Sequence, residues 1–256
     1  MNYQPHEYQQ SATDFIIKNP TAAVFLEMGL GKSVIALTAI LELCLERFEI
    51  SRVLVIAPLR VARDTWPAEI QKWDHLKGLT YSVAVGTANE RRAALRQKTF
   101  VHIINRENVQ WLIEDSGIPW QYDMVVIDEL SSFKSHQSKR FKSLMKARPG
   151  VRRMVGLTGT PSRNGLMDLW SEFRVLDMGK RLGRFITHYR EQFFEPDRRN
   201  GMQVFSYRPR AGAEREIYRR IGDITISMRS ADYLKMPECV MNTVPVKLDS
   251  TEYEGH

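Results

Sequence analysis

The sequence lacks several features that mark whole classes of protein. Only two cysteines, Cys44 and Cys239, occur in 256 residues, and neither has a second thiol or a histidine pair at metal-ligand spacing. A disulfide framework and a zinc site are therefore not expected. The start, MNYQPHEYQQ, has no charged-then-apolar signal pattern, and apolar runs such as VLVIAP are far too short to cross a bilayer. We expect a cytoplasmic protein with no membrane partner.

Positive charge is unevenly distributed along the chain. The net charge is +7, and the segment from Lys180 to Arg220 holds eleven Lys and Arg against five Asp and Glu, so this segment alone carries +6. A solvated, charged surface helix is one interpretation of such a run. Contact with a polyanion such as nucleic acid is the other.

Short apolar runs rich in β-branched residues alternate with longer amphipathic stretches. The runs are AAVFL, VLVIAP, YSVAV, VHIIN, MVVID and RMVGLT. This alternation predicts an α/β fold in which helices cover both faces of a parallel sheet. The stretch ARDTWPAEIQKW places Trp66, Ile70 and Trp73 at helical spacing, and we interpret all three as core residues. After Asp177 the Arg- and aromatic-rich sequence, with its turn-like stretch EPDRRNG, predicts a smaller basic subdomain of helical and irregular structure.

The strongest local signal is a glycine-rich loop between the run AAVFL and a helix. Its residues are Glu27, Met28, Gly29, Leu30, Gly31, Lys32 and Ser33. Glycines let backbone N–H groups turn toward an anion, and the helix presents its free N–H groups and positive dipole end to the same phosphates. Lys32 adds a charge near the β- and γ-phosphates, and Ser33 is placed to bind Mg²⁺. The strict Walker A pattern needs a glycine where this chain has Leu26.

Two carboxylates end the apolar run MVVID and supply the second half of such a site. Asp128 is suited to hold Mg²⁺, and Glu129 is suited to polarise the attacking water as general base. A strand that ends in Asp-Glu is common as a mere surface terminus. Paired with a phosphate loop on another strand, it predicts an ATP site in which Lys32, Asp128 and Glu129 are catalytic.

At this point the sequence resembles the superfamily 2 helicases, and among them the SNF2-like translocases, over nearly its whole length. LEMGLGKS is similar to the family's phosphate loop DEMGLGKT, and HEYQQ is similar to the segment whose glutamine recognises adenine, which corresponds to Gln9. The resemblance implies a RecA-like P-loop NTPase fold with ATP and Mg²⁺ as cofactors. Ser33 and Asp128 would bind the metal, and the nucleotide would contact Gln9 and the loop residues Met28, Gly29, Leu30, Gly31, Lys32 and Ser33.

Two downstream segments resemble parts of the family that lie along a nucleic-acid backbone. VLVIAPLRVARDTWPAEIQKW is similar to VAP-x-S-L-x-x-x-W-x-x-E and implies that Pro58, Leu59 and Arg60 form one contact loop. VHIINRENV is similar to the family's IT-T-Y-E segment and implies contacts from Asn105 and Arg106. Such contacts position a strand without reading its bases, so no sequence specificity is expected.

A third segment resembles the family's link between nucleotide and nucleic acid. GLTGTPSRNGLMDLWSEFRVLDMG is similar to LTGTP-x-x-N-x-x-x-ELW-x-x-x-x-FLDP, which gives Thr158, Gly159 and Thr160 this coupling role. The tetrad after the run MVVI reads DELS where the family has DEAH or DEAQ, so Ser131 stands at the relay position. A serine can still donate and accept one hydrogen bond, and this departure bears on coupling more than on ATP binding.

The resemblance also divides the chain. It implies a RecA-like ATP-binding lobe over residues 1–178, a basic helical protrusion over 179–240 that touches nucleic acid, and over 241–256 the strand-like start of a linker to a second lobe. The motifs for the arginine finger and the opposite wall of the ATP cleft are absent from this sequence. We expect a second RecA-like lobe, in cis or in trans, and almost no turnover by the chain alone.

The predicted function is therefore that of a DNA-dependent ATP hydrolase of the helicase or translocase type, from a bacterium or a phage. It would couple hydrolysis to movement on, or remodelling of, DNA, duplex or single-stranded, rather than RNA. One alternative is a nucleic-acid-binding module that nucleotide switches without turnover, although retention of Lys32 and Glu129 argues against it. Another is an unrelated phosphate-loop ATPase or kinase, which the TGTP and VAP segments argue against because a kinase has no use for two backbone-facing strand ends.

Overall fold

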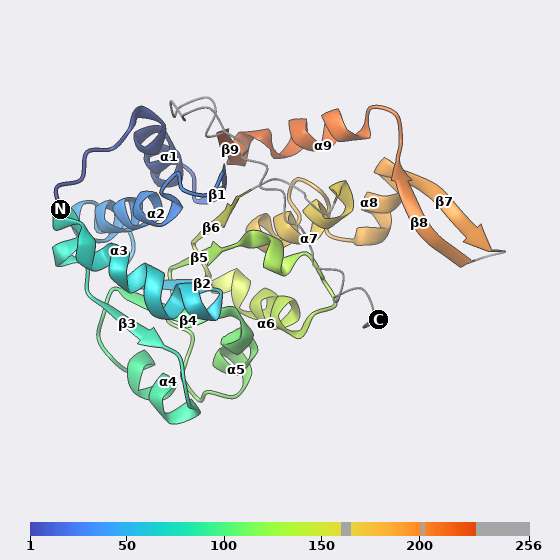
Figure 1. Cartoon of the computed structure of the whole chain (residues 1–256). Coiled ribbons are helices and arrows are strands. Elements are labelled where there is room, and N and C mark those ends of the chain that lie inside the picture. The colour runs from blue at the N-terminus through green and yellow to red at the C-terminus, as the bar shows by residue number, and fades with distance from the viewer. Residues whose placement is uncertain (160–164, 201–202, 229–256) are drawn as a thin grey trace, which may run out of the picture.

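A seven-stranded parallel sheet forms the centre of the molecule in a computed structural model, which describes residues 1–159, 165–200 and 203–228. The strand order is β3-β4-β2-β5-β6-β1-β9, and every pairing is parallel (Figure 1). The strands are β1 (Thr21–Leu26), β2 (Val53–Ala57), β3 (Tyr81–Ala84), β4 (Val101–Asn105), β5 (Met124–Asp128), β6 (Arg153–Thr158) and β9 (Thr225–Met228). The predicted α/β fold with a parallel sheet is confirmed, and the six apolar runs are strands β1 to β6.

Helices cover both faces of this sheet. One face packs against α1 (Glu7–Lys18), α2 (Lys32–Leu41) and α3 (Trp66–Lys72). The other packs against α4 (Ala88–Leu95), α5 (Val109–Glu114), α6 (Lys139–Ala147), α7 (Leu166–Asp177), α8 (Ile186–Phe193) and α9 (Ala213–Ile221). Short π or 3-10 turns are η1 (Glu42–Glu46), η2 (Val61–Thr65), η3 (Asp74–Gly78), η4 (Arg106–Asn108), η5 (Leu130–Phe133), η6 (Arg148–Gly150) and η7 (Gly222–Ile224). None of the helices in the described ranges has the length and apolar character needed to span a membrane.

The central strands are apolar on both faces because each face is covered. In β5, Val125 and Ile127 belong to the core on one side of the sheet, and Met124 and Val126 belong to the core on the other. This is the pattern that a doubly covered parallel strand requires, and it explains why these runs lack polar alternation.

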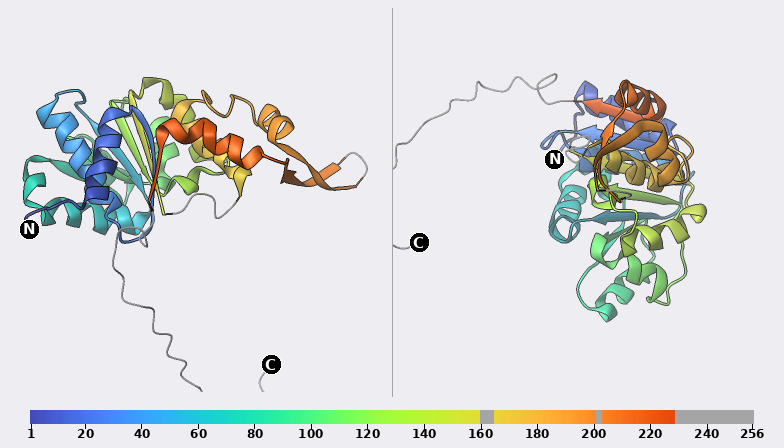
Figure 2. Two further views of the ribbon diagram at one scale, coloured as in Figure 1. Left: turned by 90° about the horizontal axis from the view of Figure 1, so that it is seen from above. Right: turned by 90° about the vertical axis from the view of Figure 1, so that its right-hand side faces the viewer.

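An antiparallel hairpin stands out from the body of the molecule beyond α8 (Figures 1 and 2). It consists of β7 (Phe194–Asn200) and β8 (Gln203–Pro209). From the sequence, residues 195–201 are interpreted as turn-like. This interpretation is wrong for residues 195–200, which belong to β7. Among the described residues the two hairpin strands pair only with each other. EPDRRN carries no apolar alternation by which a strand could be recognised.

The chain returns to the sheet after the hairpin. Ile217 and Ile221 of α9 are buried in the core, and β9 pairs with β1 as the seventh strand. The sheet therefore draws on residues beyond 178, where we expected the RecA-like lobe to end. The linker and strand expected over 241–256 lie outside the described residues.

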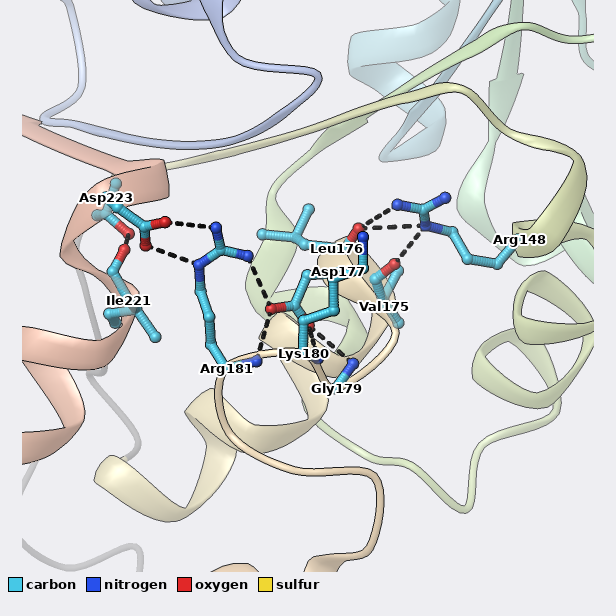
Figure 3. A network of polar contacts seen from close by, with 10 residues as sticks. Arg148, Val175, Leu176, Asp177, Gly179, Lys180, Arg181, Ile221 and Asp223 are labelled. Atoms are coloured by element: carbon cyan, nitrogen blue, oxygen red, sulfur yellow. Dashed lines mark hydrogen bonds and ion pairs between the residues drawn. The ribbon is translucent and has the colours of Figure 1, made fainter.

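The carboxyl end of α7 is held by buried Arg148. Its guanidinium donates hydrogen bonds to the carbonyl oxygens of Val175 and Leu176, with Nε at 3.0 and 3.2 Å (Figure 3). These carbonyls have no partner within a helix because they lie in its last turn. Arg148, in η6, therefore caps the carboxyl end of α7, and the helix carbonyls serve as hydrogen-bond acceptors for its buried guanidinium.

The segment after α7 is fastened by Asp177. Its carboxylate accepts the backbone N–H groups of residues 179–181 at 2.7–3.1 Å. The guanidinium of Arg181 joins Asp177, at 3.2 Å, to Asp223 in η7, where Nε lies 2.7 Å from Oδ1 (Figure 3). The start of the basic region and the turn that leads into β9 are thus bound to each other through α7.

Glu172 is the most unfavourably placed carboxyl group of α7. Its residue is only 4% exposed. Burial raises the pKa of Glu172 to about 8, and the nearby charges of Asp168 and Glu129 act in the same direction. Lys134 opposes them. Burial therefore favours the neutral, protonated form of Glu172 in the folded protein.

This burial predicts a specific pH dependence of stability. Between pH 4.5 and about 8 the folded chain keeps the Glu172 proton that the unfolded chain releases, so its contribution to the free energy of unfolding falls as pH rises through this window. Glu172→Gln removes the decline, so we expect the stability of the variant relative to wild type to increase across this window by about 1.4 kcal/mol per pH unit at most. Urea unfolding at a series of pH values measures this, with Glu191→Gln on the exposed face of α8 as control. Parallel pH curves for wild type and Glu172→Gln would contradict the assignment.

Candidate nucleotide-binding site

The predicted site residues gather at one edge of the sheet. The glycine-rich loop follows β1, while Asp128 ends β5 and Thr158 ends β6. Residues 58–60 follow β2, and Asn105 ends β4. Because all these strands are parallel, their carboxyl ends lie at the same edge, which is where open α/β sheets bind ligands.

The loop after β1 adopts a conformation that depends on glycine. Gly29 and Gly31 have φ angles of 86° and 79°, and Gly31 is the N-cap residue directly before α2. A Cβ atom on Gly31 would lie 2.7 Å from Nε2 of Gln9, so this position has neither the torsion angle nor the space for a side chain. Among the described residues no side chain caps α2, so its first N–H groups are available to an anion.

Gln9 supports the loop from behind. It lies in α1, is 8% exposed, and donates from Nε2 to the carbonyl of Leu30 at 3.4 Å. Its Oε1 accepts the backbone N–H of His6 at 3.0 Å. The amide expected to recognise adenine thus already has one partner at each end.

The two large apolar residues of the loop point in opposite directions. Met28 is 88% exposed, whereas Leu30 is fully buried in the core beneath the loop. Only the backbone of Leu30 can face a nucleotide, while the Met28 side chain remains available for contact.

Lys32 reaches back across the loop. Its Nζ donates to the carbonyl oxygens of Leu26 at 2.9 Å and Glu27 at 3.3 Å. Partial burial lowers the pKa of Lys32, and the charges of Asp128 and Glu129 oppose this shift. A Cβ atom on Gly159 would lie 3.9 Å from Nζ, so the end of β6 lies against the ammonium group.

Asp128 receives a hydrogen bond that we did not expect from the sequence. Nε1 of Trp66 donates to Oδ2 at a distance of 2.8 Å, and the Trp66 side chain is fully buried. Burial raises the pKa of Asp128, while the indole hydrogen bond and the charge of Lys32 lower it. From its helical spacing in the sequence, Trp66 is interpreted as a core residue and nothing more. The signal that could have raised the question is that a buried indole N–H needs an acceptor.

Glu129 has an unusual backbone conformation, and its side chain is contacted by two hydroxyl groups. Its φ angle is 70°, which is uncommon for a residue other than glycine. Oε1 accepts hydrogen bonds from the Ser131 hydroxyl at 2.5 Å and from the Thr158 hydroxyl at 3.0 Å. The structure thus brings the predicted general base together with two of the predicted coupling residues, one from η5 and one from β6. Thr160 lies outside the described residues.

The predicted nucleic-acid contacts fall into two groups. Leu59 is 49% exposed and Arg60 is exposed, beside the half-buried Pro58. Asn105, by contrast, is 5% exposed, and its Nδ2 donates to Oε2 of Glu107 at 2.9 Å. Arg106 forms an ion pair with Glu107 at 3.0 Å. In the loop after β2 the side chains of Leu59 and Arg60 are exposed to solvent. In the loop after β4 the side chains of Asn105 and Arg106 bond Glu107 of the same chain.

These groups suit a nucleoside triphosphate with a divalent cation. Helix N–H groups and one ammonium group favour phosphate oxygens, and a serine hydroxyl with a carboxylate supplies the oxygen ligands that Mg²⁺ prefers. All of them come from the same edge of the sheet, from the residues Gly31, Lys32, Ser33 and Asp128.

Comparison with known proteins agrees with this architecture. The model of the SNF2-related domain matches residues 8–254. Protein p41 of Acyrthosiphon pisum secondary endosymbiont phage 1 is 35% identical over 252 residues, which cover 96% of this chain and 55% of that protein. Helicase ssl-1 of Caenorhabditis elegans is 32% identical over 181 residues, which cover 68% of this chain and 7% of that protein.

A solved structure shares the fold. The SWI2/SNF2 ATPase core of Sulfolobus solfataricus, in complex with dsDNA, superposes with a TM-score of 0.73 at 21% identity, over 89% of this chain and 45% of that one. The chain thus spans about half the length, or less, of the relatives it matches. Its RecA-like fold and the family match over residues 8–254 together show that the chain belongs to the SNF2 family.

Proposed function

We propose that this chain is the ATP-binding lobe of a DNA-dependent ATPase that couples ATP hydrolysis to movement on, or remodelling of, DNA. The observation that carries the proposal is the contact of Glu129 with Ser131 and Thr158, beside Lys32 and Asp128. A site for phosphate binding alone needs no carboxylate held by hydroxyl groups from two neighbouring segments. A site that couples hydrolysis to another event needs such a connection.

Each group has a distinct role in this proposal. The loop from Met28 to Gly31 and the first turn of α2 cradle the phosphates, and Lys32 leaves its carbonyl partners to neutralise the β- and γ-oxygens. Gln9 orients the loop and contacts the adenine. Glu129 accepts the proton of the attacking water once Ser131 or Thr158 releases its oxygen.

Ser33 and Asp128 are the residues that would hold Mg²⁺. When bound, this ion neutralises charge on the β- and γ-phosphate oxygens. The chain's own contribution is to oppose the effect of burial, which raises the pKa of Asp128, through the indole hydrogen bond of Trp66 and the charge of Lys32, which lower it.

DNA is the proposed partner at the loop after β2. The solved Sulfolobus solfataricus core is in complex with dsDNA, and in this chain Leu59 and Arg60 are exposed in the loop that follows β2. We propose that Arg60 contacts phosphate directly, while Asn105 shapes the second loop through Glu107. The basic region over 179–240 is proposed to extend this contact.

A second RecA-like lobe, in cis or in trans, is the proposed partner that closes the nucleotide cleft. The chain covers 45% of the solved ATPase core, which leaves room for a lobe of similar size. An arginine finger from an opposing surface accelerates hydrolysis by about 10³ to 10⁵ in related phosphate-loop enzymes. We therefore propose slow turnover by the chain alone.

One observation favours the alternative of a nucleotide switch without turnover. Glu129 Oε1 already accepts two hydroxyl hydrogen bonds, so this oxygen is occupied unless one of the hydroxyl groups moves away. ATP turnover with and without duplex DNA, measured for this chain and for the product of its complete reading frame, separates the two. DNA-stimulated turnover by the latter supports the motor, and DNA binding without turnover supports the switch.

We predict that Lys32→Ala weakens binding of ATP in the presence of Mg²⁺ by about 10- to 100-fold, because a charge-assisted hydrogen bond contributes about 1.5–3 kcal/mol. Isothermal titration with a non-hydrolysable ATP analogue measures this. Lys18→Ala, at the exposed end of α1, should leave the affinity unchanged. Equal affinities for wild type and Lys32→Ala would contradict the proposal that Lys32 and its loop bind the nucleotide.

We also predict that Arg60→Ala lowers DNA affinity and reduces the slope of log K against log salt by about 1, as loss of one phosphate contact should. Arg63→Ala is the matched control, because Arg63 is exposed in the same segment but bonds Asp64 at 2.9 Å. Fluorescence anisotropy of a labelled duplex at several salt concentrations gives both slopes. Unchanged slopes for both variants would place DNA elsewhere.

A further inference from the structure

The Trp66 indole makes a contact whose chemistry goes beyond core packing. The side chain is fully buried, and its N–H, which is its only hydrogen-bonding group, points at Oδ2 of Asp128 at 2.8 Å. A carboxylate at a strand end can rotate about its side-chain torsions. A rigid, buried donor on one oxygen restricts that rotation.

The local helix geometry sets the direction of this indole. Trp66 comes directly after η2, which is a π-helical turn. The backbone N–H of Trp66 donates to the carbonyl of Val61, five residues earlier, rather than to that of Ala62, four residues earlier. Each residue added to a helix rotates the later residues by about 100° around the helix axis. The extra residue of the π-turn therefore decides which side of α3 faces β5, and π-turns of this kind are frequent at functional sites.

The same helix begins at the loop that faces solvent beside the sheet edge. Residues 59–60 already form a helical turn that continues into η2 and then α3, so the exposed Arg60 and the buried Trp66 lie on one continuous helical segment. Ala62, Trp66 and Ile70 are all buried along its inner side. A shift of the loop would displace Trp66 with it, because the segment packs as one body against the sheet.

We propose that Trp66 is a positioning residue for Asp128: it orients the carboxylate for a divalent cation and connects that carboxylate to the loop of residues 58–60. This inference rests on the proposed nucleotide site, and it assigns to Trp66 the part that ligand-orienting residues play in other metal sites. Loss of such a partner weakens metal binding by about 10- to 100-fold in general.

Trp66→Phe tests the proposal, because phenylalanine keeps an aromatic ring in the core and removes the donor. Trp73→Phe is the matched control: Nε1 of Trp73, directly after α3, also donates to a carboxylate at 2.8 Å, but that carboxylate is Glu69 of α3. The quantity measured is the ratio of ATP-analogue affinities with Mg²⁺ and with EDTA. We expect Trp66→Phe to reduce this ratio about tenfold through the Mg²⁺ value alone, and Trp73→Phe to leave it unchanged.

A wild-type Mg²⁺ ratio in folded Trp66→Phe would overturn the proposal and leave Trp66 as a core residue. If the wild-type chain itself binds the analogue no better with Mg²⁺ than with EDTA, the proposed nucleotide site fails rather than the role of Trp66. The two failures are therefore distinguishable.

A second measurement needs no Trp66 variant and so remains decisive if Trp66→Phe does not fold. Indole N–H signals of the ¹⁵N-labelled wild-type chain are recorded while Mg²⁺ is added to the analogue-bound form, with Asp128→Asn to identify Trp66. We expect the Trp66 signal to shift with Mg²⁺ and the Trp73 signal to stay in place. Identical behaviour of the two signals would overturn the proposal.

Discussion

The candidate site depends on one electrostatic constraint: an ammonium group and two carboxylates must stay together at the edge of a sheet that is buried on both faces. Burial lowers the pKa of Lys32 and raises that of Asp128, so each group is favoured in its charged form mainly by its neighbours. The indole of Trp66, the loop carbonyls and the Ser131 and Thr158 hydroxyls supply the remaining partners. The positions of α2, α3 and β6 around β5 can be understood as the scaffold that delivers these partners.

Much of this scaffold is predictable from local sequence because parallel strands buried on both faces leave an unmistakable pattern. The six apolar runs became β1 to β6, and the glycines of the loop have the left-handed torsion angles that an anion-binding turn needs. The strand ends at Asp128 and Thr158 were evident from the same runs. Their proximity is then a result of parallel pairing alone, since carboxyl ends meet at one edge.

Three features could not be read from the sequence, each for a physical reason. The four-residue β9 forms an edge strand beside β1 and carries too short a pattern to recognise. In the β7–β8 hairpin the stretch EPDRRN carries no apolar alternation, so its polar residues look like a turn. The contact of Trp66 with Asp128 depends on the extra residue of the π-turn, which rotates Trp66 around the helix axis. Spacing rules for an ideal α-helix do not predict this rotation.

Nucleotide and Mg²⁺ are proposed to bind among the loop after β1 and the ends of β5 and β6, and every other role assigned to this edge of the sheet depends on that binding. Backbone amide hydrogen exchange, compared with and without a non-hydrolysable ATP analogue and Mg²⁺, tests it directly. We expect slower exchange at residues 28–33 and around Glu129, with no change in the hairpin that lies away from this edge. Protection confined to other regions, or none at saturating nucleotide, would contradict the assignment of the site.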